Sequence, residues 1–314
     1  MKLYFTLLLL AANSLVAQFA PAAGKTGSTA IHADSSCFVN WAKSCSLNLG
    51  YKQINQPDSG FTAVGNSNSA VGPARTNGVV SLGDGGCAIL QFNPPIVDED
   101  GYDFAVFENA FNDSFLELAH VELSNDLINW VRIPSISLTS DSTQTPSFGT
   151  TNPEKIHNLA GKYRMPYGTP FDIHDVIDSL NYAYSFQYVR ICDVVGSISP
   201  NWGTKDSRGN YINDPWPTLF PSSGFDLDAV GVIHQGISTN TLNIQKSKYA
   251  FNRISRMLHL FEGICQTPIS LYSTSGKLVF SGVPQNNEIQ IPTNIAVGMY
   301  ILVGNNFSGK ILID

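Results

Sequence analysis

The sequence predicts an all-β protein, in which a jelly-roll-like β-sandwich is followed by a small C-terminal β-sandwich. Two observations lead to this class. Charged residues make up 14% of the 314 residues and hydrophobic residues 43%, with 26 Gly and 17 Pro, a balance typical of strands joined by turns. Short segments that alternate between apolar and polar residues, bounded by turn residues, recur along most of the chain.

The first 17 residues have the pattern of a signal peptide. Lys2 precedes an apolar run from Leu3 to Ala12, and Leu15-Val16-Ala17 matches a cleavage site before Gln18. The run is too short to span a bilayer, and no later window is long and apolar enough. We therefore expect an exported mature protein that has no transmembrane segment. Its net charge of −7 argues against binding to nucleic acid.

The larger domain is expected to span residues 18–236, with mostly loop up to residue 78. Residues 172–180 are expected to form a short helix, capped by Asp172 or Thr169. Residues 199–224 form a loop that is longer than an ordinary connection, and its Pro and Trp residues favour an ordered one. The expected strand segments are residues 79–92, with a hairpin turn at Gly83–Gly86, then 102–109, 116–126, 129–138, 186–198 and 225–235.

A second pattern of strands follows a polar linker, which we place at residues 237–251. It predicts a separate domain at residues 252–314, about 60 residues long and therefore near the lower size limit for an independent core. Its five expected strand segments are residues 256–263, 267–282, 287–292, 298–305 and 309–314.

This C-terminal domain resembles the sorting domain of the type IX secretion system. The resemblance is carried by ISLYSTSGKLV at residues 269–279, VGMYILV at residues 297–303 and GKILI at residues 309–313. It implies that the type IX secretion machinery is a partner. That machinery would carry the folded protein across the outer membrane and remove the tail, which implies a secreted or cell-surface protein.

The larger domain resembles a family of exported cell-surface proteins that carry this tail, for which no activity is established. This resemblance implies genes that lie near those for cobalamin uptake, which adds a small cofactor-like ligand to the candidates. A more distant likeness to discoidin-type, galactose-binding-like jelly rolls implies a fold rather than a ligand. The first resemblance is carried by residues 28–36, 79–86, 103–111, 158–164, 188–198 and 224–234, and the second by residues 121–130, 188–191 and 225–232.

Carboxylates at strand ends are the first candidate site. Asp103 opens an apolar strand that Glu108 and Asn109 close. Glu117 and Asp193 are further acids in strand-like segments, where acids rarely lack partners. Asp226 and Asp228 are two residues apart and therefore face the same side of their strand. The other side of that strand, with Phe225, Leu227 and Ala229, is expected to face the core.

Three interpretations of these acids stay open. They could be solvated edge charges or ion-pair partners of Arg190 and Arg132. Asp103, Glu108, Asn109, Asp226 and Asp228 could instead bind calcium, which prefers oxygen ligands, although the chain has no Asp-x-Asp-x-Asp-Gly loop. A carboxylate pair could also perform acid–base catalysis on a glycan.

Aromatic residues of the long loop are the second candidate site. Trp202, Tyr211 and Trp216 could stack on a sugar or a corrin-like ring, or Trp216 could plug the end of the sandwich. No catalytic motif is present. We therefore expect a non-catalytic module that binds a glycan or a small cofactor-like ligand such as cobalamin. The alternatives are a hydrolase of surface polysaccharide and a structural or adhesive surface component.

Five Cys residues are compatible with disulfides in an oxidising compartment. Cys37 and Cys45 are close enough in sequence to staple one loop. Cys87 and Cys192 lie in strand-like segments, where isolated buried thiols are an equal interpretation.

Overall fold

The computed structural model describes residues 19–177, 184–236, 249–252, 255–260, 268–304 and 307–313. The chain divides into two compact units, residues 1–238 and residues 239–314. The predicted signal peptide and residues 237–248 of the predicted linker lie outside the described residues.

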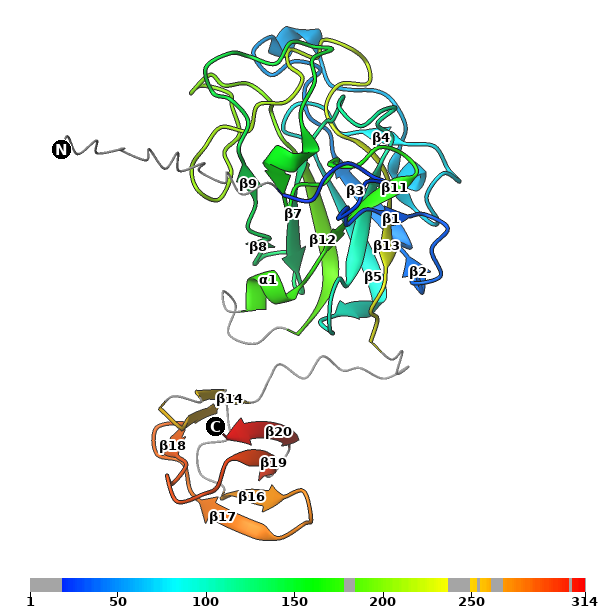
Figure 1. The fold of residues 1–314 in the computed structure, drawn as a ribbon. Coiled ribbons are helices and arrows are strands. Elements are labelled where there is room, and N and C mark those ends of the chain that lie inside the picture. Colours follow the sequence, from blue (N-terminus) through cyan, green and yellow to red (C-terminus); the bar gives the residue numbers. More distant parts are fainter. Residues whose placement is uncertain are drawn as a thin grey trace, which may run out of the picture. The chain divides into compact units, whose positions relative to one another are not determined.

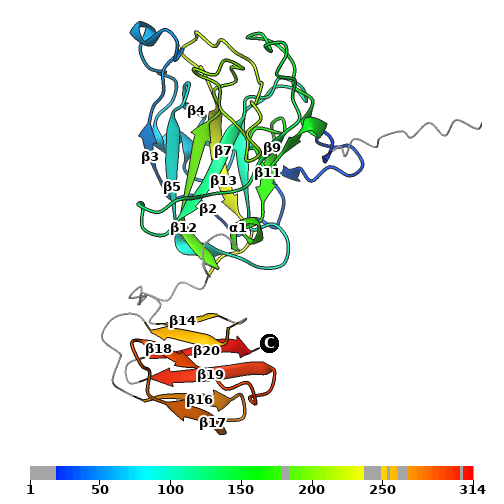
Figure 2. The same ribbon diagram turned by 90° about the vertical axis from the view of Figure 1, so that its left-hand side faces the viewer.

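Two antiparallel sheets form the layers of the first unit (Figures 1 and 2). The first sheet has the order β1 (Ile31–His32), β11 (Tyr167–Phe171), β6 (Phe104–Glu108), β13 (Asp226–Val232), β2 (Asn40–Trp41), with β4 (Val80–Ser81) also beside β13. The second has the order β3 (Ser44–Asn48), β5 (Cys87–Val97), β12 (Ser185–Asp193), β7 (Ala119–Ser124), β8 (Val131–Arg132). The remaining elements are the pair β9 (Ile136–Ser137) and β10 (Ile156–His157), the 3-10 turns Pro57–Ser59, Ser67–Ala70 and Pro153–Lys155, and α1 (His174–Ile177).

One hydrophobic core fills the space between these two sheets. Phe104, Val106 and Leu227 enter it from the first sheet, and Leu90 and Val189 enter it from the second. All five side chains are buried, so their burial contributes the main favourable term to folding. The predicted all-β sandwich is therefore confirmed.

The hairpin predicted across Gly83–Gly86 is wrong. β4 pairs with β13 in the first sheet, whereas β5 pairs with β3 and β12 in the second. The turn therefore carries the chain from one layer to the other. Gly83 and Gly85 have φ values of 75° and 73°, which a residue with a Cβ rarely adopts.

A β-bulge in β13 corrects the predicted alternation of that strand. Its pairing with β6 shifts between Leu227 and Ala229. Beyond the shift, Val230 and Val232 face the main core, and Ala229 packs in a separate cluster on the far face. An extra residue in one strand has this effect because it reverses which side chains point inward.

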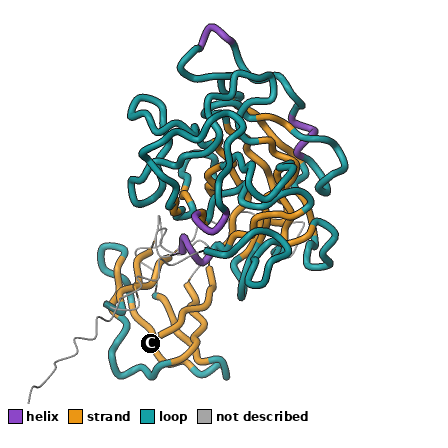
Figure 3. The backbone as a smooth tube through the Cα atoms, turned by 45° about the horizontal axis from the view of Figure 1, so that its top comes forward, coloured by secondary structure: helices purple, strands orange, loops and turns teal. Residues whose placement is uncertain are grey.

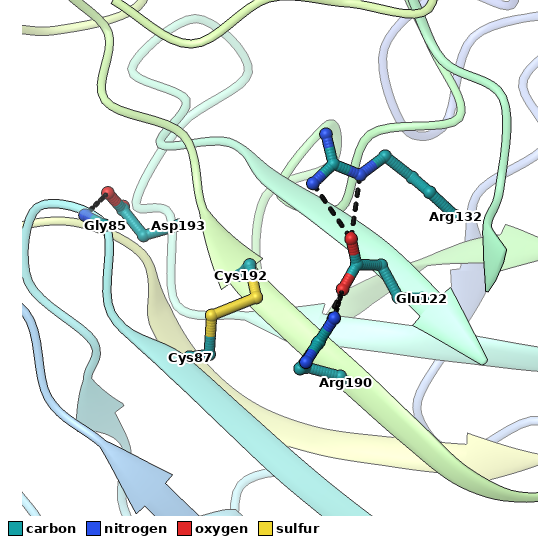
Figure 4. Close-up of a disulfide and its surroundings, with 7 residues drawn as sticks. All are labelled: Gly85, Cys87, Glu122, Arg132, Arg190, Cys192 and Asp193. Carbon is teal, nitrogen blue, oxygen red and sulfur yellow. Dashed lines mark hydrogen bonds and ion pairs between the residues drawn. A yellow bond between two sulfur atoms is a disulfide. The ribbon is translucent and has the colours of Figure 1, made fainter. Parts of the chain in front are cut away.

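A disulfide joins β5 and β12 through Cys87 and Cys192, which are 105 residues apart in the sequence (Figure 4). Cys37 and Cys45 are free thiols, so the pairing considered for them is wrong. Cys45 lies on β3, where burial raises its pKa to about 12. Cys265 lies outside the described residues.

Long loops gather at one end of this unit, and Figure 3 shows them in teal. We call it the loop end. It is where β6 ends at Glu108, β12 ends at Asp193 and β13 begins at Asp226. At the opposite end, which we call the Asp103 end, Val97 closes β5 and Asp103 precedes β6.

The second unit has two antiparallel sheets around its own core. One has the order β14 (Tyr249–Asn252), β15 (Met257–Leu260), β18 (Glu288–Gln290), and the other β17 (Leu278–Gly282), β16 (Ile269–Ser273), β19 (Gly298–Gly304), β20 (Phe307–Ile313). Leu258, Leu271, Ile291, Leu302 and Ile313 are buried together. Two more strands are present than expected, because residues 267–282 form a hairpin and β14 occupies part of the predicted linker.

Candidate functional site

Four of the five predicted metal ligands lie at the loop end, on the neighbouring ends of β6 and β13. Glu108 is the last residue of β6, and Asn109 follows it directly. β13 runs antiparallel beside this strand and begins with Asp226, and Asp228 lies within its bulge. Leu227 pairs with Glu108 in the sheet, which places the acids on either side of it next to the end of β6.

Few donors satisfy these acids, although all three are buried. Glu108, which is 2% exposed, accepts a hydrogen bond from the Ala110 N–H at 2.8 Å. Asp226 accepts one from the Ser81 hydroxyl. Asn109 adds its backbone N–H to Glu108 and its side chain to Asp226. Both oxygens of Asp228 accept the Arg75 backbone N–H at 3.0 Å. The Asp226 and Glu108 carboxylates therefore keep lone pairs for a further partner.

Glu117, a strand acid that was not among the predicted metal ligands, adds to this group, because the charges of Glu108 and Asp226 act on it. It lies in the loop between β6 and β7 and is half-buried. No hydrogen bond to its carboxylate occurs among the described residues. Its neighbours in sequence, Leu116 and Leu118, made it look like part of an apolar strand. An acid between two buried leucines needs a partner, but the sequence does not say which strand ends lie beside it.

The electrostatics of the group are those of carboxylates that repel one another. Burial, followed by the nearby charge of Asp226, raises the pKa of Glu108 well above its ordinary value. Burial, followed by the charges of Glu108 and Asp226, does the same to the pKa of Glu117. Burial raises the pKa of Asp226 to about 6. Such shifts mean that the folded protein favours either protons or a cation at this place.

Neighbouring acids at the loop end have a different arrangement. Asp84 accepts hydrogen bonds from the Ile54 N–H, the Trp216 indole and the Thr218 hydroxyl. Asp193 accepts two, from the N–H groups of Gly85 (Figure 4) and Phe225. These contacts bind the loops to the ends of the strands, so we assign both acids a structural role.

The proposed partnership with arginine is wrong for the predicted acids. Arg190 and Arg132 both bind Glu122 on the outer face of the second sheet (Figure 4), with Arg132 Nη2 at 2.8 Å. The Arg190 guanidinium carbon also lies 4.1 Å from the centre of the Trp130 ring. These arginines therefore do not neutralise the acids of the loop end, and those acids are buried rather than solvated edge charges.

Asp103, the fifth predicted ligand, lies at the other end of β6. It lies five positions before Glu108, which corresponds to about 16 Å along a strand. The expectation that all these acids gather at one place is therefore wrong. Asp103 is fully buried and accepts hydrogen bonds from Glu99 N, Ile173 N and His234 Nδ1 at 3.1, 2.7 and 2.9 Å.

The predicted aromatic platform is spread over the long loop. Trp216 is half-buried and donates its indole N–H to Asp84 Oδ2 at 3.1 Å, as a side chain that plugs the loop end would. The amine of Lys205 lies 4.6 Å from the Tyr211 ring centre, and Trp202 is 39% exposed. No ring contact links Trp202, Tyr211 and Trp216 in the part of the chain that is described.

Phenylalanines form an aromatic group that the sequence did not reveal. Phe148 is 77% exposed and lies between Phe115 and Phe220, with ring centres 6.4 and 5.6 Å away. The three come from loops that are far apart in sequence, so only the fold brings them together. They add an apolar surface to the loop end.

Comparison with known proteins leaves the family open. No protein-family model and no curated protein sequence matches the chain. Among solved structures, β-glucuronidase from Ruminococcus gnavus in complex with D-glucaro-δ-lactam is 10% identical, with a TM-score of 0.22. That match covers 87% of this chain and 45% of the other. The complex of the same enzyme with uronic deoxynojirimycin is 11% identical, with a TM-score of 0.21, and the match covers 88% of this chain and 44% of the other. The chain therefore spans less than half of their length, and the likeness is too weak to support a function.

The single α-helix in the described ranges, α1, has four residues. A helix that could cross a bilayer is not found among the residues that the structure describes.

Proposed function

We propose that this chain is an exported cell-surface protein whose larger unit is a non-catalytic binding module that holds calcium at the loop end. The signal-peptide pattern at residues 1–17 and the likeness of residues 252–314 to a type IX sorting domain support export. The type IX secretion machinery is then its partner in crossing the outer membrane.

The disulfide between Cys87 and Cys192 supports the export part of this proposal. Disulfides persist outside the cytoplasm, where glutathione and thioredoxin do not reduce them. The bond joins two neighbouring strands in the middle of the second sheet, within the folded sandwich. A chain that matures in an oxidising compartment gains stability from it.

The observation that carries the calcium proposal is the shortage of donors around Glu108, Glu117 and Asp226. The charge of Asp226 raises the pKa of Glu108, and the charges of both raise the pKa of Glu117. The only donors found for the three among the described residues belong to Ala110, Asn109 and Ser81. Among the described residues, none of the ion pairs involves any of them. A calcium ion would neutralise carboxylates of this kind, and it takes six to eight oxygen ligands.

The organic ligand of the module would bind beside this cation. Trp202 and Phe148 present exposed rings on the loops of the same unit. Exposed rings can stack on a sugar or on a planar cofactor such as cobalamin. A cation at the loop end would also order those loops, which is why binding of calcium is the first property to test.

The experiment is thermal unfolding of the full chain with calcium and with a chelator. At a calcium concentration about 100 times Kd, the midpoint should rise by about 5–10 °C. Glu117→Gln should bind one calcium fewer by titration calorimetry, whereas Asp141→Asn, which alters an exposed acid, should bind as the parent does. Identical melting curves with and without chelator would contradict the proposal.

A further inference from the structure

Three carboxylates from separate segments meet at the Asp103 end. Asp98 follows β5, Asp103 precedes β6 and Asp172 precedes α1. One oxygen from each lies within 4.8 Å of the oxygens of the other two. This group shares no residue with the loop-end acids and is about 16 Å from them along β6.

The oxygens of this group have lone pairs that the protein does not use. A carboxylate offers about four lone-pair sites. Asp103 uses three of them, on the N–H groups of Glu99, Ile173 and the His234 ring. Asp172 uses one, on the His174 N–H at 2.8 Å.

Asp98 provides a second, independent observation, a buried oxygen without a partner. Its side chain is 13% exposed, and its Oδ1 atom is shielded from solvent and accepts no hydrogen bond from the residues that the structure describes. A buried acceptor without a partner is rare in native proteins, because it loses its hydration without compensation. The ring nitrogen His174 Nδ1 is 3.8 Å from the other oxygen and belongs to a side chain that is 76% exposed.

The surrounding charges do not balance the three acids. In the described part of the chain, the ion pairs of this group involve His174 and His234, which are charged only when protonated, and no Lys or Arg. The pKa of Asp172 is raised by burial, and Asp98 is among the nearby charges that add to this. Burial also raises the pKa of Asp103, with a smaller contribution from Asp172.

We propose that Asp98, Asp103 and Asp172 form a second divalent-cation site, which takes calcium. Carboxylate oxygens from loop and strand termini are the ligands that this ion prefers, and main-chain carbonyls and water complete its shell. The ion joins the end of β5, the start of β6 and the start of α1. It also lies beside His234, where the chain leaves the sandwich, since Asp103 binds that ring and the His234 N–H.

The test is Asp98→Asn, compared with Asp141→Asn, in a background of Glu117→Gln and Asp226→Asn that removes the loop-end group. Calorimetric titration of the full chain with calcium should show one site in the background protein and in its Asp141→Asn derivative. Adding Asp98→Asn should abolish that site, or weaken it at least tenfold. Circular dichroism checks that each variant is folded.

Thermal melts give a second, independent measurement. In chelator, Asp98→Asn should melt at or above the background protein, because the amide removes a repelling charge. In calcium the order should reverse, because the background protein gains several degrees and the variant does not. The proposal is overturned if calcium shifts both proteins equally, or if the background protein binds no calcium.

The two calcium proposals can fail separately. If Glu117→Gln removes one calcium site from the titration and Asp98→Asn removes none, only the loop-end site exists. If Asp98→Asn removes one site and Glu117→Gln removes none, only the site at the Asp103 end exists.

Discussion

Asp226 shows at the scale of one residue how burial links stability to pH. Its pKa is raised from 3.8 to about 6 because burial penalises the charged form. The folded protein therefore binds more protons than the unfolded chain between about pH 4 and pH 6. The contribution of Asp226 to stability is fully present below that window and is lost as the pH rises through it.

We expect this dependence to appear when chelator is present. From pH 4.5 to pH 7.5, the unfolding free energy of the parent should fall by about 1–3 kcal/mol relative to Asp226→Asn, whose side chain does not titrate. Urea unfolding at several pH values measures it. The comparison with the variant is needed because burial lowers the pKa of His120 to about 4, which changes stability in the opposite direction.

Calcium should flatten the same curve. A bound cation holds Asp226 and its neighbours in the charged form, so fewer protons are taken up between pH 4 and pH 6. A parent protein whose difference from Asp226→Asn does not change with pH would show that Asp226 titrates normally in the folded state.

At the scale of single elements, the disulfide between β5 and β12 should be a large source of stability. It closes a loop of 105 residues, and crosslinks of long loops restrict the unfolded chain most. We expect replacement of Cys87 and Cys192 by Ser to lower the unfolding free energy by about 2–4 kcal/mol. Denaturation of the parent with and without reductant checks this. Cys45→Ser provides the control, because its thiol is free.

The strand β6 shows what the sequence could and could not reveal. The alternation of Phe104–Phe107 predicted a buried strand, and the acids at its two ends were visible. Nothing in one strand says which neighbour pairs with it, so the sequence could not tell that β13 brings Asp226 to Glu108. A strand also keeps its two ends apart, which is why Asp103 is not part of that group.

Non-local partners account for the other misses. Cys87 and Cys192 pair because β5 and β12 lie side by side in register, a fact that spacing in the sequence does not contain. Asp98 meets Asp172 for the same reason, through the packing of segments that are 74 residues apart in the numbering. Local patterns determine strands and turns well, whereas sites assembled from several strands depend on the topology.

At the scale of the whole molecule, the two units have separate cores and should unfold separately. The larger core contains residues of the first unit alone, and the smaller contains residues of the second. A chain that ends at Ser238 should therefore keep the melting temperature of the first unit within about 2 °C. Calorimetry of the full and shortened chains measures this.

The same truncation tests the proposed export. In a bacterium with a type IX secretion system, the full chain should reach the medium or the cell surface, and the shortened chain should stay in the periplasm. Immunoblots of the fractions report the outcome. Equal amounts of both chains outside the cell would remove the sorting role from residues 252–314.

The crosslink has a mechanical consequence for the surface protein that we propose. When the chain is pulled from its two ends, the segment between Cys87 and Cys192 cannot extend. The fully unfolded chain is therefore shorter by roughly 350 Å of contour length. The strands β6 and β7, together with Asp98, Asp103, Glu108, Glu117 and Asp172, lie inside that segment. Shear from flowing liquid could peel away β13 and still leave most of the acidic groups within a closed covalent ring.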